Sequence, residues 1–248
     1  MAVEYNGGYD VVNNDINGYL NILAAFTFCY NIKVDGTSDA TLRGAVSWNG
    51  TTMHQSGYNI YAINGKLDYY LRDSSGRTTT WRIISALSNY TVGQWYTCVG
   101  RFYDDGSNFQ MDYWIDGVKQ GNWTAVNETV TPVWQSGVKL YVGKDLLNKI
   151  FPVTISDMAI WNTNLTDDQC VQLGTFKKRG VPLQMKPDNL IGYWTMDEYN
   201  DGLDPLQEII DGSGKFNDWN NYGTKPLSVW TVAGSSGLRL YQRPRPFP

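Results

Sequence analysis

Hydrophobic and polar residues alternate along several short stretches of the chain, which is the pattern of β-strands with one buried face. In residues 25–34, AFTFCYNIKV, every second side chain is large and apolar. These side chains are Phe26, Phe28, Tyr30, Ile32 and Val34. The same period of two predicts further strands at residues 94–103, 108–115, 138–143 and 153–161.

Turn signals lie between and within these strands. The run DDGS at residues 104–107 predicts a hairpin, and Asp116-Gly117 is a favoured dipeptide for a type I′ turn. Midway through the last strand the alternation slips by one residue, which predicts a β-bulge at Ser156 and Asp157. The strands are therefore expected to run antiparallel.

One short helix is marked by its caps. Thr166 stands at the N-cap, and Gln169, three residues later, completes a capping box. Leu165 and Cys170 occupy the positions of a hydrophobic staple, and Gly174 is expected to end the helix. We therefore interpret Cys170 as a small buried apolar residue rather than a reactive thiol.

Composition favours many short strands over helices. Aromatic residues make up 14% of the 248 residues, charged residues make up 18%, and there are 25 glycines. With one helix, this predicts an all-β fold, an antiparallel two-sheet sandwich. No linker long enough to divide the chain is present, so residues 1–224 are expected to form one domain. Residues 225–248, which end in QRPRPFP, are expected to form a strap or tail because proline cannot enter a central strand.

Charge and hydropathy exclude two classes of partner. The net charge is −4, without the basic footprint that nucleic-acid binding requires. No apolar stretch approaches the roughly 18 residues of a membrane span, so membrane insertion is not expected. The N-terminus MAVEYNGGYD has neither a charged region nor an apolar core of a signal peptide, which predicts synthesis in the cytoplasm.

The order of these segments resembles the laminin-G-like and pentraxin-like branch of the concanavalin A-like lectin/glucanase superfamily. VEYNGGYDVV resembles the opening strand of that family, and GQWYTCVGRFYDDGSNFQMDYWIDG resembles its central hairpin. VTISDMAIWNTNLTDDQCVQL resembles its closing strand and capped helix. The resemblance covers residues 3–224 and implies a jelly-roll sandwich that binds glycans or protein surfaces, often with calcium.

One segment stands in an unusual place. In typical members of that family, the segment resembling GYWTMDE and DGSGKFNDWNNYG precedes the opening strand, whereas here it follows the helix. We interpret the chain as a circular permutant in which residues 190–197 take the sheet position of the N-terminal strand. The alternative, a second domain, would have about 25 residues beyond the motif, too few to bury a core.

The resemblance also implies a disulfide. Cys29 and Cys98 match positions at which pentraxin-like members carry a disulfide between neighbouring strands. Two reduced thiols are the alternative, since an unsecreted chain would keep them reduced. Both alternatives stay open at this point.

Catalysis is not expected. Glycoside hydrolysis occurs on the resembled fold and needs two carboxylates across a cleft. The chain has four glutamates, none in a Glu-x-Asp-x-Glu arrangement, and the best remaining pair, Asp112 with Asp116, ends at a turn. His54 is the single histidine, and no nucleophile elbow accompanies it.

Calcium is the candidate cofactor. DGSGKFND places Asp211, Asn217 and Asp218 around a tight glycine turn, and these are the hard oxygen ligands that Ca²⁺ prefers. The acidic cluster that pentraxins carry after the strand resembling LYVGKD is missing here. The alternative is that these residues are turn formers.

Aromatic residues beside asparagine are the candidate glycan-binding residues. A sugar presents apolar C–H faces and hydroxyl groups, so its site needs an aromatic platform flanked by directional hydrogen-bonding groups. The first candidate is Trp219, followed by Asn220, Tyr222, Trp123 and Trp48. The alternative for each tryptophan is a place in the core.

These observations favour a non-catalytic module that recognises glycans, a cell-surface ligand or a protein surface. A lectin-like chain without a secretion signal suggests a virion surface or capsid decoration protein, exposed when the virion is released. In that case the C-terminal strap, QRPRPFP, would dock on a capsid or a neighbouring subunit. A purely structural, oligomerising sandwich is the alternative.

Overall fold

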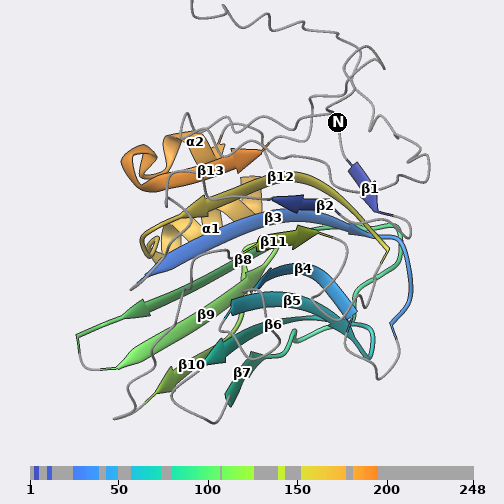
Figure 1. The fold of residues 1–248 in the computed structure, drawn as a ribbon, viewed down its shortest axis with the longest axis horizontal. Coiled ribbons are helices and arrows are strands. Elements are labelled where there is room, and N and C mark those ends of the chain that lie inside the picture. Colours follow the sequence, from blue (N-terminus) through green and yellow to red (C-terminus); the bar gives the residue numbers. More distant parts are fainter. Residues whose placement is uncertain are drawn as a thin grey trace, which may run out of the picture.

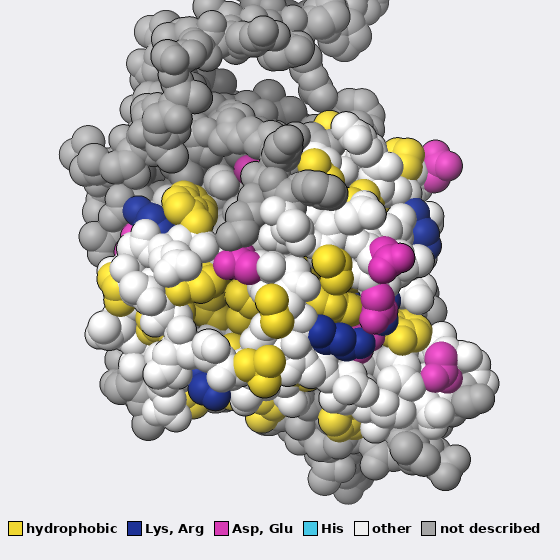
Figure 2. All heavy atoms as spheres, turned by 180° about the vertical axis from the view of Figure 1, so that it is seen from behind, with side chains coloured by type: hydrophobic (Ala, Val, Ile, Leu, Met, Phe, Trp, Pro, Cys, Tyr) yellow, Lys and Arg dark blue, Asp and Glu magenta, His cyan; other side chains and the backbone are white. Residues whose placement is uncertain are grey.

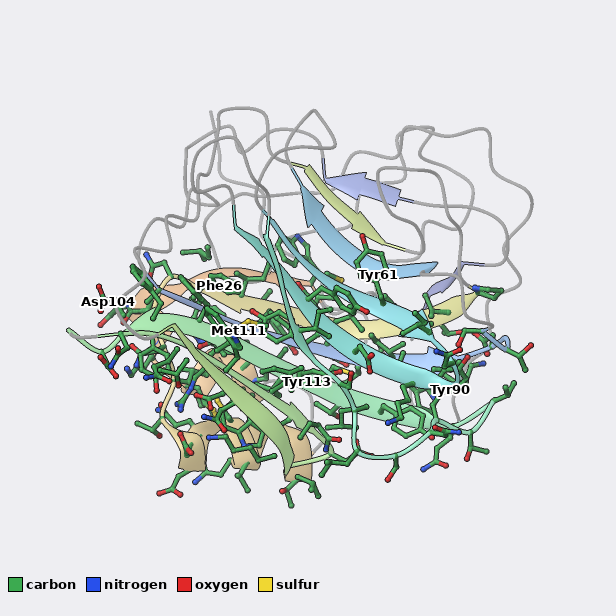
Figure 3. All side chains as sticks on the ribbon, turned by 90° about the horizontal axis from the view of Figure 1, so that it is seen from below. Phe26, Tyr61, Tyr90, Asp104, Met111 and Tyr113 are labelled. Atoms are coloured by element: carbon green, nitrogen blue, oxygen red, sulfur yellow. The ribbon has the colours of Figure 1, made fainter. Side chains whose placement is uncertain are left out.

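Two antiparallel sheets stack face to face in the computed structural model (Figure 1), and the described part of the chain includes three short helices beside one of them. Viewed from below, the helices, the first sheet and the second sheet form three successive layers (Figure 3). The predicted all-β sandwich is confirmed. The structure describes residues 3–5, 10–12, 25–38, 43–49, 57–73, 80–106, 108–125, 139–142, 152–176 and 181–194.

The first sheet, sheet A, has seven strands. Their order is β1 (Val3–Tyr5), β12 (Val153–Trp161), β3 (Phe26–Val34), β8 (Trp95–Asp104), β9 (Phe109–Ile115) and β10 (Val118–Ala125), and β13 (Leu190–Trp194) also pairs with β12. Strands β1 and β13 share one edge of β12: β1 pairs with its first residues and β13 with its last.

The second sheet, sheet B, has six strands. Their order is β2 (Asp10–Val12), β11 (Lys139–Val142), β4 (Arg43–Asn49), β5 (Gly57–Ile63), β6 (Lys66–Asp73) and β7 (Thr80–Ile84). The helices are α1 (Asp167–Phe176), α2 (Val181–Gln184) and the 3₁₀ helix η1 (Pro187–Asn189). None of the helices in the described ranges is long and apolar enough to span a membrane.

The main core lies between the sheets and follows the predicted alternation of β3. Its five inward side chains, from Phe26 to Val34, are completely buried. The outward side chains of the same strand were expected to face solvent, and this prediction is wrong at one end. Thr27 and Cys29 are buried because the helices cover this part of sheet A, whereas Asn31 and Lys33 stay partly exposed.

The predicted turns and the bulge are confirmed. Asp116 and Gly117 both have positive φ, 52° and 78°, as a type I′ turn requires. The pairing of β12 with β3 shifts register between Ser156 and Met158, and Asp157 there has a φ of 46°. The Tyr193 hydroxyl donates a 3.0 Å hydrogen bond to the Asp157 carboxylate, which ties the bulge to β13.

The predicted capping box begins α1, but the helix does not end at Gly174. The Gln169 backbone N–H donates to the Thr166 hydroxyl, and the Thr166 N–H donates to the Gln169 side chain. The helix continues to Phe176. Gly174 serves a different purpose: a Cβ there would lie 2.1 Å from the backbone nitrogen of Gly117, so only glycine allows the helix to pack against this turn.

Strand β13 joins the same sheet as β3 and β8, within the segment predicted at residues 190–197. All five of its residues are buried. The circular permutation itself stays a prediction, and residues 195–248, with the expected strap, lie outside the described part of the chain.

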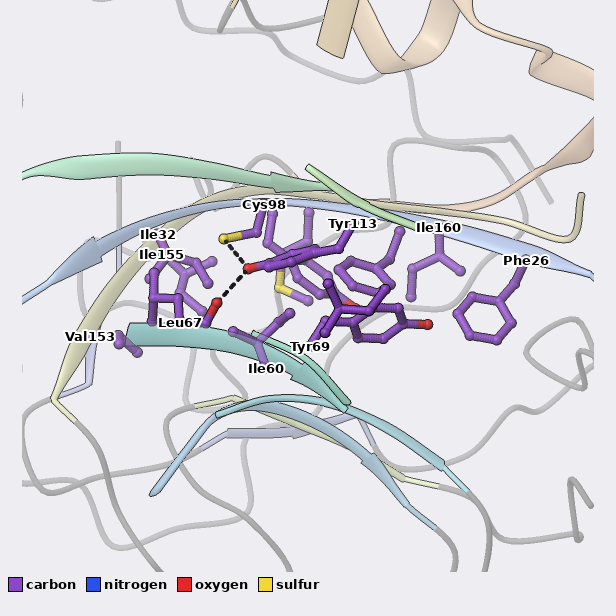
Figure 4. Packing of buried hydrophobic residues seen from close by; sticks show 14 of the residues in the cluster. Phe26, Ile32, Ile60, Leu67, Tyr69, Cys98, Tyr113, Val153, Ile155 and Ile160 are labelled. Carbon is purple, nitrogen blue, oxygen red and sulfur yellow. Dashed lines mark hydrogen bonds between the residues drawn. The ribbon is translucent and has the colours of Figure 1, made fainter. Parts of the chain in front are cut away.

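Two tyrosines in the core differ in how their hydroxyls are satisfied. Tyr113 of β9 reaches across the sandwich, where its hydroxyl donates a 3.1 Å hydrogen bond to the Leu67 carbonyl of β6 (Figure 4). The Cys98 sulfur lies 3.3 Å from the same hydroxyl oxygen. The hydroxyl of Tyr69 is equally buried but has no hydrogen-bond partner.

This contrast predicts opposite effects of one chemical change. Tyr69→Phe removes an unsatisfied buried hydroxyl and should raise the free energy of unfolding by about 1 kcal/mol. Tyr113→Phe breaks the bond between the sheets and should lower it by about 1–3 kcal/mol. Urea denaturation of both variants measures the difference, and a stability loss in Tyr69→Phe would show that its hydroxyl has a partner after all.

Candidate functional site

The outer face of β8, β9 and β10 carries three rows of side chains that the strand register aligns. We call these nine residues the outer array. The rows are Tyr103, Gln110 and Thr124; Arg101, Asp112 and Asn122; and Val99, Trp114 and Lys119. The alternate residues of the same strands, such as Met111 and Tyr113, point into the main core. The array therefore lies on three paired strands whose other face packs on the main core.

A buried ion pair forms the centre of the array. Arg101 and Asp112 are 5% and 3% exposed, and both Nε and a terminal nitrogen of the guanidinium contact one Asp112 oxygen, at 2.8 and 2.7 Å. The guanidinium also donates a 2.6 Å hydrogen bond to the Leu165 carbonyl and another to the Asp167 carboxylate. Arg101 thus joins the sheet to the start of α1, because Leu165 and Asp167 flank the N-cap.

Lys119 and Trp114 complete this centre. The Lys119 ammonium lies 2.7 Å from the second Asp112 oxygen and 3.4 Å from Asp167. The Trp114 ring lies 5.0 Å from the Arg101 guanidinium and 5.1 Å from the Lys119 ammonium, so both cations face its π-system. Two positive and two negative groups are therefore held together over one aromatic ring.

The electrostatics favour the charged forms of these groups. Burial alone would lower the pKa of Arg101 and of Lys119, but Asp112 outweighs it and raises both. Burial alone would raise the pKa of Asp167, but the Arg101 charge, followed by Lys119, lowers it below its ordinary value of 3.8. The contacts of Arg101 with Leu165 and Asp167 hold the start of α1 against the sheet.

The first row of the array is uncharged and partly exposed. The Thr124 hydroxyl donates a 2.6 Å hydrogen bond to the side-chain oxygen of Gln110. The side-chain nitrogen of Gln110 donates in turn to the Asp105 carboxylate, at 2.9 Å. The Tyr103 ring is partly exposed, with the Arg101 guanidinium 4.8 Å from its centre. Asn122, in the next row, is exposed. This places an aromatic ring beside a fixed amide, an exposed amide and a hydroxyl, the combination that sugars require.

Figure 2 shows the face of the molecule that carries the helices. Basic, acidic and hydrophobic side chains lie close together there, among uncharged polar ones. Where its side chains are described, sheet B offers a ligand less than the outer array does. On its outer face, Tyr61 and Tyr70 meet edge to face at 5.0 Å, but each is only 6% exposed. The outer array is therefore the better candidate.

The carboxylates considered for catalysis have structural partners. Asp112 receives Arg101 and Lys119 on its two oxygens. Asp116, in the turn, accepts a 2.8 Å hydrogen bond from the Thr97 backbone N–H. Both carboxylates thus stabilise the hairpin and its helix. His54 lies outside the described residues.

The predicted aromatic platform is only partly within the described residues. Trp123 lies in β10 opposite Met111 and packs, half-buried, against the main core rather than among the outer side chains. Trp48 lies in β4, where it pairs with Tyr58 and Leu140, and its side chain is outside the description. Trp219, Asn220 and Tyr222 also lie outside it.

The predicted calcium ligands Asp211, Asn217 and Asp218 lie outside the described residues too. Within the described ranges, no group of three or more His, Cys, Asp or Glu side chains is placed to hold a metal ion. Calcium binding by the 211–218 loop stays a prediction.

The implied disulfide does not fit the structure. Cys29 pairs with Val99, and Cys98 pairs with Tyr30, so the two cysteines point to opposite faces of sheet A. Cys98 lies in the main core, whereas Cys29 lies with Cys170 in the second core beneath the helices. All three thiols are free and buried, and burial raises the pKa of Cys98 and of Cys170 to about 12.

The sequence contains a signal for part of the array. Polar residues alternate with core residues on three consecutive strands joined by tight turns. Register in such hairpins is set by the turns, so Tyr103 could have been aligned with Gln110 in advance. Thr124 could not, because an irregularity between Lys119 and Gly121 shifts the rest of β10 by one residue. Arg101 gives no such signal, because its partner Asp167 is distant in sequence.

A laminin-G-type family, described as the concanavalin A-like lectin/glucanases superfamily, matches residues 6–170 of the chain. No curated protein matches the chain in sequence.

Solved structures of several binding proteins are similar to the chain. A protein of Bacteroides ovatus ATCC 8483 assigned to carbohydrate binding has a TM-score of 0.59 and 15% identity, over 90% of this chain and 57% of its own. The CBM40 domain of the Ruminococcus gnavus IT-sialidase, bound to α2,3-sialyllactose, has a TM-score of 0.55 and 16% identity, over 69% of this chain and 94% of its own. The binding domain of botulinum neurotoxin DC, in complex with rat synaptotagmin II, has a TM-score of 0.50 and 16% identity, over 70% and 41%. At these identities the likeness establishes the fold.

The ionised cluster predicts an acid-sensitive contribution to stability. Because the pKa of Asp167 is lower in the folded protein than in the unfolded chain, its stabilisation is present above about pH 4–5 and is lost as the pH falls through the folded pKa. Asp167→Asn should lower the free energy of unfolding at pH 7 by about 0.5–1 kcal/mol, since the carboxylate is half exposed.

Urea denaturation at pH 7 and pH 3 tests this, with Asp168→Asn as the matched control. Asp168 is its exposed neighbour in the same helical turn. The difference between wild type and Asp167→Asn should shrink at pH 3. An unchanged difference at both pH values would contradict the role of the Asp167 charge.

The cysteine environments predict slow thiol chemistry in the folded protein. Cys29, Cys98 and Cys170 should react with iodoacetamide at pH 8 at least about 100-fold more slowly than a free thiol, because burial disfavours the thiolate. Mass spectrometry after alkylation in urea without reductant should find three modified cysteines. One modified cysteine would instead reveal a disulfide.

Proposed function

Because the chain belongs to the concanavalin A-like lectin/glucanases superfamily, we propose that it is a non-catalytic binding module that recognises glycans through its outer array. The observation that carries the proposal is the alignment of Tyr103 with Gln110, Thr124 and Asn122 on one exposed strand face. The apolar face of a sugar ring would rest on the Tyr103 ring, and its hydroxyls would bond to the amides and the Thr124 hydroxyl.

The array is preorganised for such a ligand. Gln110 is fixed on both sides, by Thr124 and by Asp105. Tyr103 rests against Arg101, which is itself held by two carboxylates and a carbonyl. Side chains already fixed before binding lose little conformational entropy, so weak polar contacts with a sugar yield more net affinity.

The similar structures are consistent with a binding role. One is a carbohydrate-binding domain bound to sialyllactose and another is a toxin domain bound to synaptotagmin II. The second supports the alternative ligand, a protein surface. Three further predictions lie beyond what the described residues can test. They are a purely structural, oligomerising role, a virion or capsid partner, and calcium binding by the 211–218 loop.

Glycan-array binding followed by titration tests the proposal. Tyr103→Ala should weaken binding about tenfold, through the loss of about 1–2 kcal/mol of ring contact. Asn122→Ala should weaken it severalfold through one lost hydrogen-bonding group. Asn89→Ala is the matched control: Asn89 is exposed and adjoins Tyr90, at the opposite end of the sandwich from Asp104 (Figure 3).

One further variant, Trp219→Ala, and one further condition, a chelator, separate the alternatives. If Trp219→Ala abolishes binding and Tyr103→Ala leaves it unchanged, the site lies in the 211–222 segment and the outer array is excluded. Loss of binding in a chelator would place calcium in or beside the site. No glycan binding in any condition would overturn the proposal and favour a protein ligand.

A further inference from the structure

We propose that the ligand of the outer array is an uncharged glycan, and that acidic sugars are rejected there. This inference rests on the proposed function and specifies its ligand. It follows from two features of the charges in and around the array. The negative groups outnumber the positive ones, and the positive groups already have partners within the protein.

Carboxylates outnumber cations at the array. The described residues place two cations there, Arg101 and Lys119, and three carboxylates that contact array residues directly. The carboxylates are Asp105, Asp112 and Asp167. A carboxylate or sulfate group on a sugar would therefore meet an excess of like charge, which disfavours binding at close range.

The two cations are also already occupied. Arg101 is buried, and its guanidinium donates hydrogen bonds to Asp112, Asp167 and the Leu165 carbonyl. Lys119 has a 40% exposed side chain, but its ammonium lies between Asp112 and Asp167. An acidic ligand that reached this ammonium would have to displace one of these carboxylates or lie beside both.

The exposed groups that stay available are uncharged. Asn122 and the Tyr103 hydroxyl can each donate and accept hydrogen bonds, as sugar hydroxyls do. Thr124 gives its hydroxyl hydrogen to Gln110 and so offers a ligand acceptor lone pairs, and Gln110 offers its second amide N–H. The carboxylates are no better suited to a cationic partner, since Asp112 holds two cations and Asp105 accepts from Asn108 and Gln110. The chemistry presented to solvent is therefore that of a site for neutral hydroxyl-rich ligands.

Matched glycan pairs test this directly. Each pair shares one core and differs by an acidic group, as lactose differs from α2,3-sialyllactose. The neutral member should bind at least about tenfold more tightly in 20 mM salt, and the difference should narrow in 500 mM salt as repulsion is screened. Tighter binding of the acidic members would overturn this inference and leave the proposed function standing. Failure to bind any glycan would overturn both.

A charge variant outside the array provides the second test. Asp168→Lys changes an exposed side chain in the first turn of α1. It should strengthen binding of the acidic members about threefold at low salt and leave the neutral members unchanged. Thr175→Lys, at the other end of the same helix, is the control and should have a smaller effect. Equal effects of Asp168→Lys on both members of a pair would contradict the electrostatic explanation.

Discussion

Burying a guanidinium group beneath a helix is costly unless acceptors meet its N–H groups, and the outer side of sheet A is arranged around this requirement for Arg101. Its acceptors come from β9, from the residue before the N-cap of α1 and from the first residue of that helix. Removing any one of them would leave a buried charge partly unpaired, which is more costly than losing a surface ion pair. Arg101 thus contacts the start of α1, the Trp114 ring and the Tyr103 ring at once.

Sheet A is buried on both faces where the helices cover it, unlike a sandwich sheet whose outer face is exposed to solvent. The inward residues of β3, β8 and β12 build the main core, and their alternate residues build a second core beneath α1 and α2. Gly174 lets the helix backbone meet the Asp116-Gly117 turn, so the second core closes without a gap at that end. Because the strands under the helices are clamped from both sides, the neighbouring exposed rows keep a fixed geometry.

The fold was largely predictable and the site largely was not. Period-two patterns located β3, β8, β9, β11 and β12 because one face of each strand is apolar and the other polar. The strands β4 to β7 escaped notice, since outward tyrosines such as Tyr61 and Tyr70 blur the alternation. Capping chemistry located the start of α1, but its end depends on a tertiary contact at Gly174 that no local pattern reveals. The cysteines show the same limit: resemblance aligned Cys29 with Cys98, whereas a one-residue difference in register turns them to opposite faces.

The shared edge of β12 also bears on how the chain is made. One long side of this strand receives β1, from the first residues of the chain, and β13, from residues 190–194. During synthesis the second half of that edge has no partner until the ribosome has released the last of these strands. Until then its backbone groups offer a template for other chains, as any unpaired strand edge does. Nascent chains that pause between α1 and β13 would therefore be the ones that need a chaperone.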